Sequence, residues 1–467
     1  MGILNIFKRK ASDEEFINAI ADLNLSEVED LIERGANVNS IGNNGATALM
    51  AASYSDNADI FNLLIKSGAD INFTMADGKT ALFIASQKNN PETIKTLIKH
   101  GADVNICGSG GASALIVASR NGHYDVVEIL LKHGAEVDIH TDTGVSALFM
   151  AADVGNLDIV NILLNSGATV DSESSDDITA LWQAAQEGYV DIVKALIGAN
   201  ANINQMRKSD NATPLWQAAQ NGHISVVECL IAAGAEIEAK QKNDITPLYV
   251  AAQNGHADVV DLLIHAKAKP GVYETKFGQT PLRKAAENRH ARIVTLLIAA
   301  GVNVDGKSHN GVTPLWQAAQ NGHTDIVRLL LDAGADPDIA QDNDTTPIII
   351  AAAQGHLETV RLLADGGADI NASIDSGVTA LFLAAQEGLL DVVSYLLDAN
   401  ASVNCQHSSG ATPLLFLSQF GNAGIIQQIL SMGADPHVML DGGVTPLSMA
   451  KQNGNAEVMK LLEAAMQ

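Results

Sequence analysis

The chain has 467 residues, of which 47% are hydrophobic and 18% are charged, a balance typical of folded globular proteins and not of disordered chains. Acidic residues outnumber basic ones by 54 to 28. The resulting net charge of −26 argues against a nucleic-acid partner, because binding to a phosphate backbone requires clustered cations. No apolar run reaches the ~18 residues of a membrane-spanning helix. The three cysteines (Cys107, Cys229, Cys405) are far apart and form no CxxC pair, so we expect a reducing, cytoplasmic compartment.

Residues 1–12 form a tail that precedes the repeated part of the chain. Ile3, Leu4, Ile6 and Phe7 are followed by the basic run 8–10. Because these charges follow the apolar stretch instead of preceding it, the tail is not a secretory signal. Two interpretations stay open: a frayed terminus, or a short anchor in the membrane interface.

Residues 13–44 are predicted to form a capping unit at the N-terminal end of the repeats. Two capping-box patterns, Ser12 with Glu15 and Ser26 with Glu29, predict that a helix begins after each serine. The surface of this unit is strongly acidic, as expected for the polar end of an open stack of repeats.

Residues 45–443 contain twelve internal repeats, each marked by a Thr/Ser-(Pro/Ala)-Leu/Ile triplet. Ten of the twelve intervals between triplets are 33 residues long and two are 34. A fixed period of this length indicates stacked supersecondary units and not separate globular domains. The triplets, including the one in the last unit, begin at Thr47, Thr80, Ser113, Ser146, Thr179, Thr213, Thr246, Thr280, Thr313, Thr346, Thr379, Thr412 and Thr445.

The pattern within each copy predicts two short helices. The hydroxyl of the triplet caps the first helix, and a proline at the next position has φ preset for the first turn. The second helix carries an apolar stripe and ends at a residue suited to the left-handed conformation. These residues are Gly35, Gly68, Gly101, Gly134, Gly167, Gly234, Gly301, Gly334, Gly367 and Gly433, with Asn200 and Asn400 in two copies and Lys267 in another.

Residues 444–467 are predicted to form the C-terminal capping repeat. Lys451 replaces an alanine that packs in the internal copies, and the last helix is expected to run to Ala465. A polar final unit again suits the end of a stack.

The repeated residues resemble the ankyrin repeat. The matching motifs are Thr-Pro-Leu-x-x-Ala-Ala, the Asn-Gly-His turn, the Val-Val-x-Leu-Leu helix and the Gly-Ala-Asp-Ile-Asn exit, and they cover residues 13–467. The resemblance implies an all-α repeat solenoid of about 14 helix pairs with short β-hairpin connections. It also implies a non-enzymatic protein that binds other proteins.

One departure from the family pattern recurs along the chain. The family usually has histidine after Thr-Pro-Leu, and here aromatic side chains take that position in seven copies. One interpretation is that these rings fill the core. The other is a partly exposed aromatic row on the concave face that anchors a partner. The residues are Phe83, Phe149, Trp182, Trp216, Tyr249, Trp316 and Phe382.

Histidines and asparagines also recur at fixed positions. Equivalent positions lie roughly 10 Å apart, too far for a shared metal ion, so we expect the turn histidines to support the turn. They are His123, His223, His256, His290, His323 and His356. We expect the residues at the exit of each copy to shape that turn by local side-chain-to-backbone bonds. They are Asn39, Asn72, Asn105, Asp138, Asp171, Asn204, Asp305, Asp338, Asn371 and Asn404.

The copies whose length or turn residues differ from the repeat also differ in charge from the acidic chain as a whole. Both 34-residue intervals place their extra residue near a hairpin tip, and the segment 267–292 has seven basic residues against two acidic ones. This segment is either a solvated face or a docking patch in which tip aromatics are flanked by cations. Lys284 is expected to face the concave side.

The chemical motifs of an enzyme are missing: the sequence has no HExxH, CxxC or GxSxG. We therefore expect no catalytic residues, no cofactor and no metal, and a monomer that binds an unidentified protein. Two alternatives stay open: a peripheral membrane adaptor anchored by the tail, and a host-directed effector of an intracellular bacterium. The predicted partner-binding residues are Trp182, Gln183, Met206, Arg207, Lys208, Trp216, Gln217, Tyr249, Tyr273, Phe277, Arg283, Lys284, Trp316 and Gln317.

Overall fold

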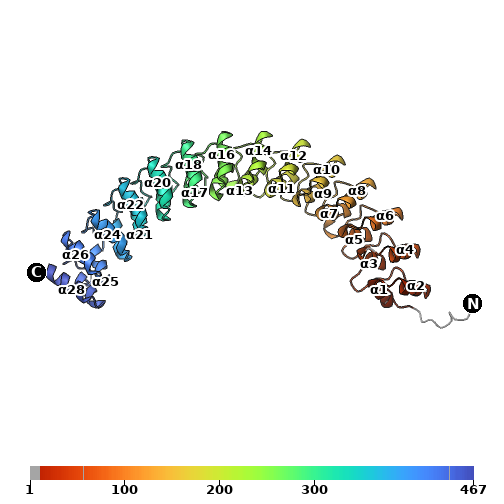
Figure 1. Ribbon diagram of the computed structural model, residues 1–467, viewed down its shortest axis with the longest axis horizontal. Coiled ribbons are helices and arrows are strands. Elements are labelled where there is room, and N and C mark those ends of the chain that lie inside the picture. Colours follow the sequence, from red (N-terminus) through yellow and green to blue (C-terminus); the bar gives the residue numbers. More distant parts are fainter. Residues whose placement is uncertain (1–10, 56, 441) are drawn as a thin grey trace, which may run out of the picture. The chain divides into compact units, whose positions relative to one another are not determined.

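The computed structural model describes residues 11–55, 57–440 and 442–467. The chain divides into two compact units. The first comprises the residues up to Ala218 together with Ser225–Glu236, and the second comprises Ala219–Ile224 with Ile237–Gln467. Each unit is a row of helix pairs in which successive pairs lie side by side (Figure 1). The residues of the tail that bear on a membrane anchor, 1–10, lie outside the described part of the chain.

The helices follow the repeat one pair at a time. The pairs up to the junction are α1 (Asp13–Ala21) and α2 (Leu25–Glu33), α3 (Ala48–Ser55) and α4 (Ala58–Lys66), α5 (Ala81–Lys88) and α6 (Pro91–Lys99), α7 (Ala114–Arg120) and α8 (Tyr124–Lys132), α9 (Ala147–Asp153) and α10 (Leu157–Asn165), α11 (Ala180–Glu187) and α12 (Val190–Gly198), and α13 (Pro214–Asn221) and α14 (Ile224–Ala232). The remaining pairs, all in the second unit, are α15 (Pro247–Asn254) and α16 (Ala257–His265), α17 (Pro281–Glu287) and α18 (Ala291–Ala299), α19 (Pro314–Gln320) and α20 (Thr324–Asp332), α21 (Pro347–Ala353) and α22 (Leu357–Asp365), α23 (Ala380–Gln386) and α24 (Leu390–Asp398), α25 (Pro413–Phe420) and α26 (Ala423–Ser431), and α27 (Pro446–Gln452) and α28 (Ala456–Ala465).

The triplet hydroxyls cap the first helices, as the sequence predicts. Thr179, for example, accepts a hydrogen bond from the backbone N–H of Trp182, three residues on. Thr346 and Thr412 stand at the same position but make no capping bond. At the N-terminal end, the capping box of Ser12 is confirmed. The box predicted at Ser26 is wrong, because α2 begins at Leu25, two residues earlier than predicted, and is capped by Asn24.

The second helices end as the sequence predicts. Asn200 and Asn400 adopt the left-handed conformation with φ of 64° and 59°, and Lys267 does so with φ of 73°. Gly322, in the turn between α19 and α20, is required for two reasons. Its φ is +66°, and a Cβ there would lie 2.6 Å from the ring of His356 in the next repeat.

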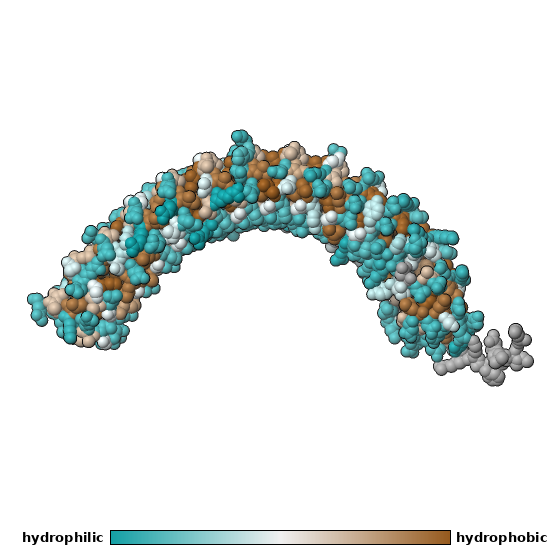
Figure 2. Space-filling view, viewed as in Figure 1, coloured by the Kyte–Doolittle hydropathy of each residue, from teal (hydrophilic) through white to brown (hydrophobic). Residues whose placement is uncertain are grey.

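The core of each unit lies between successive helix pairs. First helices pack on first helices, as α7 does on α9 and α17 on α19, and second helices pack on second helices, as α20 does on α22. Triplet leucines and the alanines one turn later are almost fully buried, as are the valine and leucine stripes of the second helices. Apolar residues therefore lie along the helices, bordered by hydrophilic ones (Figure 2).

The connections between pairs are turns stabilised from one repeat to the next. Four of them contain a single antiparallel bridge, and the described residues form no longer strands. Neighbouring tips are joined by backbone bonds: Asp142 N–H donates to Gly110 C=O at 2.8 Å, and Thr275 N–H donates to Asn243 C=O at 3.0 Å. These bonds satisfy backbone groups that an isolated turn would expose. Within the described residues, no helix is long and apolar enough to cross a membrane.

Candidate functional site

The aromatic position after each triplet lies in the core. The three tryptophans are at most 6% exposed. The indole Nε1–H of Trp182 donates to the C=O of Ala212 in the next connection at 2.9 Å, and that of Trp316 donates to Thr345 C=O at 2.8 Å. The prediction that these rings fill the core is confirmed. The alternative of a partly exposed aromatic row is wrong, because all of these rings except the half-buried Phe149 are buried.

The polar residues beside these rings are also buried. Gln183, Gln217 and Gln317 lie next to the three tryptophans, and Gln183 donates from Nε2 to Asp153 Oδ1 at 2.7 Å. Tyr249 takes the aromatic position of its own repeat and is buried. Burial, as the larger cause, and the nearby charge of Glu274, as the smaller one, raise the pKa of its hydroxyl. These side chains stabilise the stack and offer little surface to a partner.

The turn histidines have the structural role that the sequence predicts. The ring Nε2 of His256 lies 2.9 Å from Gln220 C=O, and that of His323 lies 3.0 Å from Glu287 C=O, each in the preceding repeat. His123, His290 and His356 make the same contact. Within residues 11–55, 57–440 and 442–467, the structure contains no group of three or more His, Cys, Asp or Glu side chains placed to hold a metal ion.

The exit residues make a different bond from the local one that the sequence predicts. Each side-chain oxygen accepts the backbone N–H of a residue 31 or 32 positions later, in the next repeat, at 2.7 to 3.1 Å. We call this series of bonds the exit ladder. Its rungs run from Asn39 to Asp70, Asn72 to Asp103, Asn105 to Glu136, Asp138 to Thr169, Asp171 to Asn202, Asn204 to Glu236, Glu238 to Lys269, Asp305 to Asp336, Asp338 to Asp369, Asn371 to Ser402 and Asn404 to Asp435.

The basic segment 267–292 does not form one continuous patch. Arg283 takes the aromatic position of its repeat and is only 7% exposed, and burial lowers the pKa of its guanidinium. Its Nη2 donates to Gln317 Oε1 at 2.6 Å, whereas its Nε and Nη1 have no partner in the described part of the chain. The prediction that Arg283 contributes to an exposed basic patch is therefore wrong.

Other cations of the segment are neutralised by acidic neighbours. Lys284 is largely buried and pairs with Glu287 at 2.9 Å. Arg289 pairs with Asp325 at 3.1 Å, and Arg292 pairs with Asp258 at 2.6 Å. The sequence predicts a net positive segment correctly, but most of these partners lie more than 30 residues away.

The exposed remainder of the segment is its connection. Tyr273 is 55% exposed and Phe277 is 52% exposed, and the ammonium of Lys276 lies 4.9 Å from the centre of the Phe277 ring. The buried carboxylate of Glu274 accepts the backbone N–H groups of Lys276, Phe277 and Gln279 and thereby orders the tip. The predicted tip aromatics are therefore held in place on the surface.

The corresponding connection in the first unit has fewer exposed side chains that could contact a partner. Met206 and Lys208 are exposed. Arg207 makes contacts within the chain: it pairs with Asp210 at 2.5 Å, and its guanidinium carbon lies 4.7 Å from the centre of the Trp182 ring. Arg207 thus covers the tryptophan and is not a free cation.

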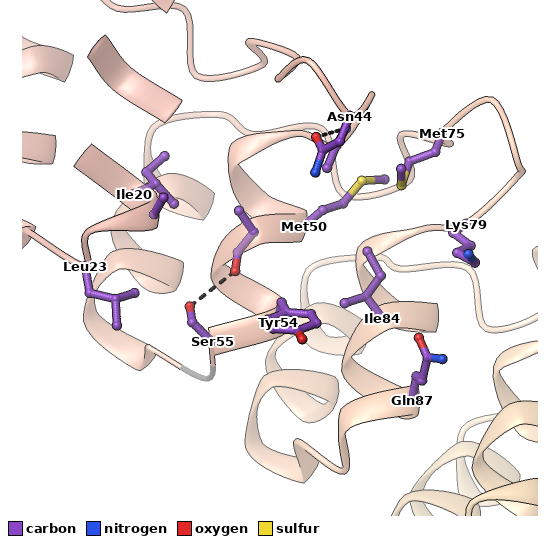
Figure 3. Close-up of a pocket in the computed structure, with 13 residues that line it drawn as sticks. Ile20, Leu23, Asn44, Met50, Tyr54, Ser55, Met75, Lys79, Ile84 and Gln87 are labelled. Carbon is purple, nitrogen blue, oxygen red and sulfur yellow. Dashed lines mark hydrogen bonds between the residues drawn. The ribbon is translucent and has the colours of Figure 1, made fainter. Parts of the chain in front are cut away.

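A cavity that the sequence analysis missed lies in the first unit, between α1, α3 and α5. Its volume is about 660 Å³. In Figure 3, Met50 and Met75 approach each other beneath Asn44, and Tyr54 lies close to Ile84. Tyr54 is exposed, and the ammonium of Lys88 lies 4.0 Å from the centre of its ring. Ile84 by itself gives no signal in the sequence, because apolar residues take this position in most copies and glutamine does so in only three.

Comparison with known proteins identifies the repeat. The family described as "Ankyrin repeats (3 copies)" matches residues 16–107, 59–141, 107–176, 181–274, 248–341 and 334–407. No curated protein matches the chain. Among solved structures, the human ASB11 ankyrin repeat domain is 27% identical with a TM-score of 0.43, over 48% of this chain and 98% of that one.

Proposed function

We propose, from the premise that this chain belongs to the ankyrin repeat family, that it is a non-enzymatic scaffold whose connections bind a partner protein. Ankyrin repeats are in general protein–protein interaction modules. A cytoplasmic location is part of the proposal and is supported by the three free cysteines. A specific partner would bury more than ~1,000 Å² of surface in the complex.

One observation carries this proposal: the exposed aromatic pair Tyr273 and Phe277. The other exposed aromatic side chains of the described residues, Tyr54, Tyr124 and Phe420, lie on helices and not on a connection. The pair stands more than half exposed on a connection that Glu274 has ordered, with Lys276 beside it. Aromatic side chains are enriched in protein interfaces, and tyrosine is among the residues that most often dominate the binding energy. An ordered tip also loses little entropy on binding.

The test is capture of partners by the full chain with and without this pair. The double variant Tyr273→Ala/Phe277→Ala should lose a defined subset of the proteins that the unaltered chain captures and that mass spectrometry identifies. The matched control is Tyr124→Ala, which removes an exposed aromatic from α8 and should lose none of them. Truncation of exposed side chains costs little stability, so both variants should fold. Capture of the same proteins by all three chains would contradict the assignment of this surface.

A second surface is the cavity between α1, α3 and α5. Its walls are mainly apolar and include Met75, Tyr54 and Ile84 (Figure 3). Tyr54 is exposed, and Met75 and Ile84 are partly exposed. Apolar grooves of this kind hold the hydrophobic side chains of a partner. Ile84→Gln, which introduces the side chain found at the equivalent position of other copies, should abolish any contact of this kind. Retained contacts in a cross-linking experiment would exclude the cavity as a binding surface.

A further inference from the structure

The exit ladder is interrupted in the second unit. The residue at the exit position between Glu238 and Asp305 is Gly271, which has no side chain and cannot accept the N–H of Asn303 in the next repeat. The turn itself is regular: Val272 N–H bonds to Lys269 C=O as Gln205 N–H does to Asn202 C=O. The backbone is therefore in place, and only the acceptor oxygen is missing.

A cavity of about 200 Å³ lies where the rung is missing. Gly271 and Asn303 line it from the two exit turns, together with Tyr273 and Lys307. A second, shallower cavity of about 480 Å³ shares Gly271 and Tyr273 with the first and is also lined by Lys240 and Lys269. Gly271 and Tyr273 thus line two neighbouring cavities, and lysine side chains line each of them.

The rest of the ladder shows which chemical group fits the gap. Every other rung is closed by an Asn, Asp or Glu oxygen that accepts a backbone N–H. Glu238, which closes the preceding rung onto Lys269 N–H at 2.8 Å, shows that the longer side chain is accommodated. An oxygen acceptor supplied by another molecule would restore the same bond to Asn303.

The local charge selects a carboxylate over an amide. Lys267, Lys269 and Lys307 are exposed and form no ion pair in the described residues, although the chain as a whole carries a charge of −26. A carboxylate beside Lys307 would make a charge-assisted bond, about twice as strong as a neutral one. In an extended peptide, side chains two residues apart point to the same face about 7 Å apart, so two acidic residues of one segment can face this surface together.

We propose that this gap, the open rung, binds an acidic peptide segment of a partner protein, whose Asp or Glu carboxylate takes the place of the missing exit side chain. This inference rests on the proposed function and names the chemistry of its partner. The carboxylate accepts the Asn303 N–H and pairs with Lys307. The segment crosses Tyr273, and a second acidic side chain two residues away pairs with Lys269.

The test uses the chain's own way of closing the rung. Gly271→Asn introduces the residue found at most other exits and fills the gap without adding charge. Gly271→Ala is the matched control, since a Cβ at this position meets no atom within 4 Å and leaves the acceptor absent. A library of random 12-residue peptides displayed on phage is selected against the full chain, and the affinities of the selected peptides are then measured for the three chains.

The expected result is enrichment of Asp and Glu two residues apart. Binding should weaken at least about tenfold in Gly271→Asn and stay within about twofold in Gly271→Ala. Three results would overturn the inference: no selected peptides, selected peptides without acidic enrichment, or acidic peptides that bind Gly271→Asn unchanged. Peptides that tolerate Gly271→Asn but are lost with Tyr273→Ala/Phe277→Ala would support the proposed function while overturning the open rung.

A second copy of this chain is the other possible occupant, because residues 329–450 contain 14 acidic residues and one basic residue. Sedimentation velocity of the unaltered chain and of Gly271→Asn separates the two cases. The proposal expects both to sediment as monomers. Self-association that Gly271→Asn abolishes would assign the site to a second copy and overturn the partner peptide.

Discussion

Closing the open rung should stabilise the second unit even when no ligand is present. Replacement of glycine at a position with ordinary φ restricts the unfolded chain and stabilises by about 0.4–1 kcal/mol. Gly271 has no left-handed φ and has open space for a Cβ, so Gly271→Ala should gain only the stabilisation that comes from restricting the unfolded chain. Gly271→Asn should gain in addition the bond to Asn303. Because the rungs are exposed, this bond is worth about 0.5–1 kcal/mol, the lower part of the range for neutral hydrogen bonds.

The measurement has to be local, because stacked repeats do not unfold in a single two-state transition. Hydrogen exchange read by mass spectrometry over residues 267–305 should slow about two- to fivefold more in Gly271→Asn than in Gly271→Ala. Exchange in α2 and α4 should be unchanged in both and serves as the internal control. Equal exchange in the two variants would refute the interpretation of the exit residues as a ladder between repeats, and would remove the basis for the open rung.

Three further predictions concern other parts of the repeat. Trp182→Phe replaces the buried indole by a smaller ring and removes the bond to Ala212, so it should lower the local stability by about 2–3 kcal/mol in hydrogen exchange over residues 180–212; a loss below about 0.5 kcal/mol would contradict its structural role. Lys267→Gly relieves a left-handed φ of 73° and should raise stability by about 1 kcal/mol, whereas a decrease would show that the Lys267 side chain contributes more than its backbone costs. Burial raises the pKa of Asp305, so ionisation of this carboxyl destabilises the folded state as the pH rises. Asp305→Asn keeps the acceptor for Asp336 N–H and should therefore be more stable than the unaltered chain at pH 7, by less than about 1 kcal/mol, and equally stable below about pH 3.5. A stability difference that does not depend on pH would refute this.

Much of the fold could be predicted from local chemistry. The hydroxyl of Thr179 caps a helix, Asn200 accepts a left-handed φ, and Ala and Leu recur at the spacing of a helix face, all within one repeat. The wrong capping-box prediction at Ser26 also concerns neighbouring residues only. Asn24, two residues earlier, was an equally good cap, and the spacing of Ser26 and Glu29 did not exclude it.

The candidate site was harder to predict, because its residues act through partners in other repeats. Arg283 and Trp316 both follow a Thr-Pro-Leu triplet, and nothing adjacent in the sequence shows that the next connection covers them. Likewise, Arg289 is in the sequence only one of the seven basic residues of 267–292, and the structure places Asp325 beside it. Such pairings lie about one period apart, so they depend on how neighbouring copies are stacked.

The period, the helix pairs, the helix ends and the unusual basic segment could be inferred from the amino-acid order alone, because each depends on residues a few positions apart. Three features required the folded stack: the aromatic row is core, the exit residues form a ladder, and Gly271 interrupts it. A rung is a bond between side chain and backbone 31 or 32 residues apart. Its absence becomes visible only when the two turns lie side by side, because glycine is otherwise an ordinary turn residue.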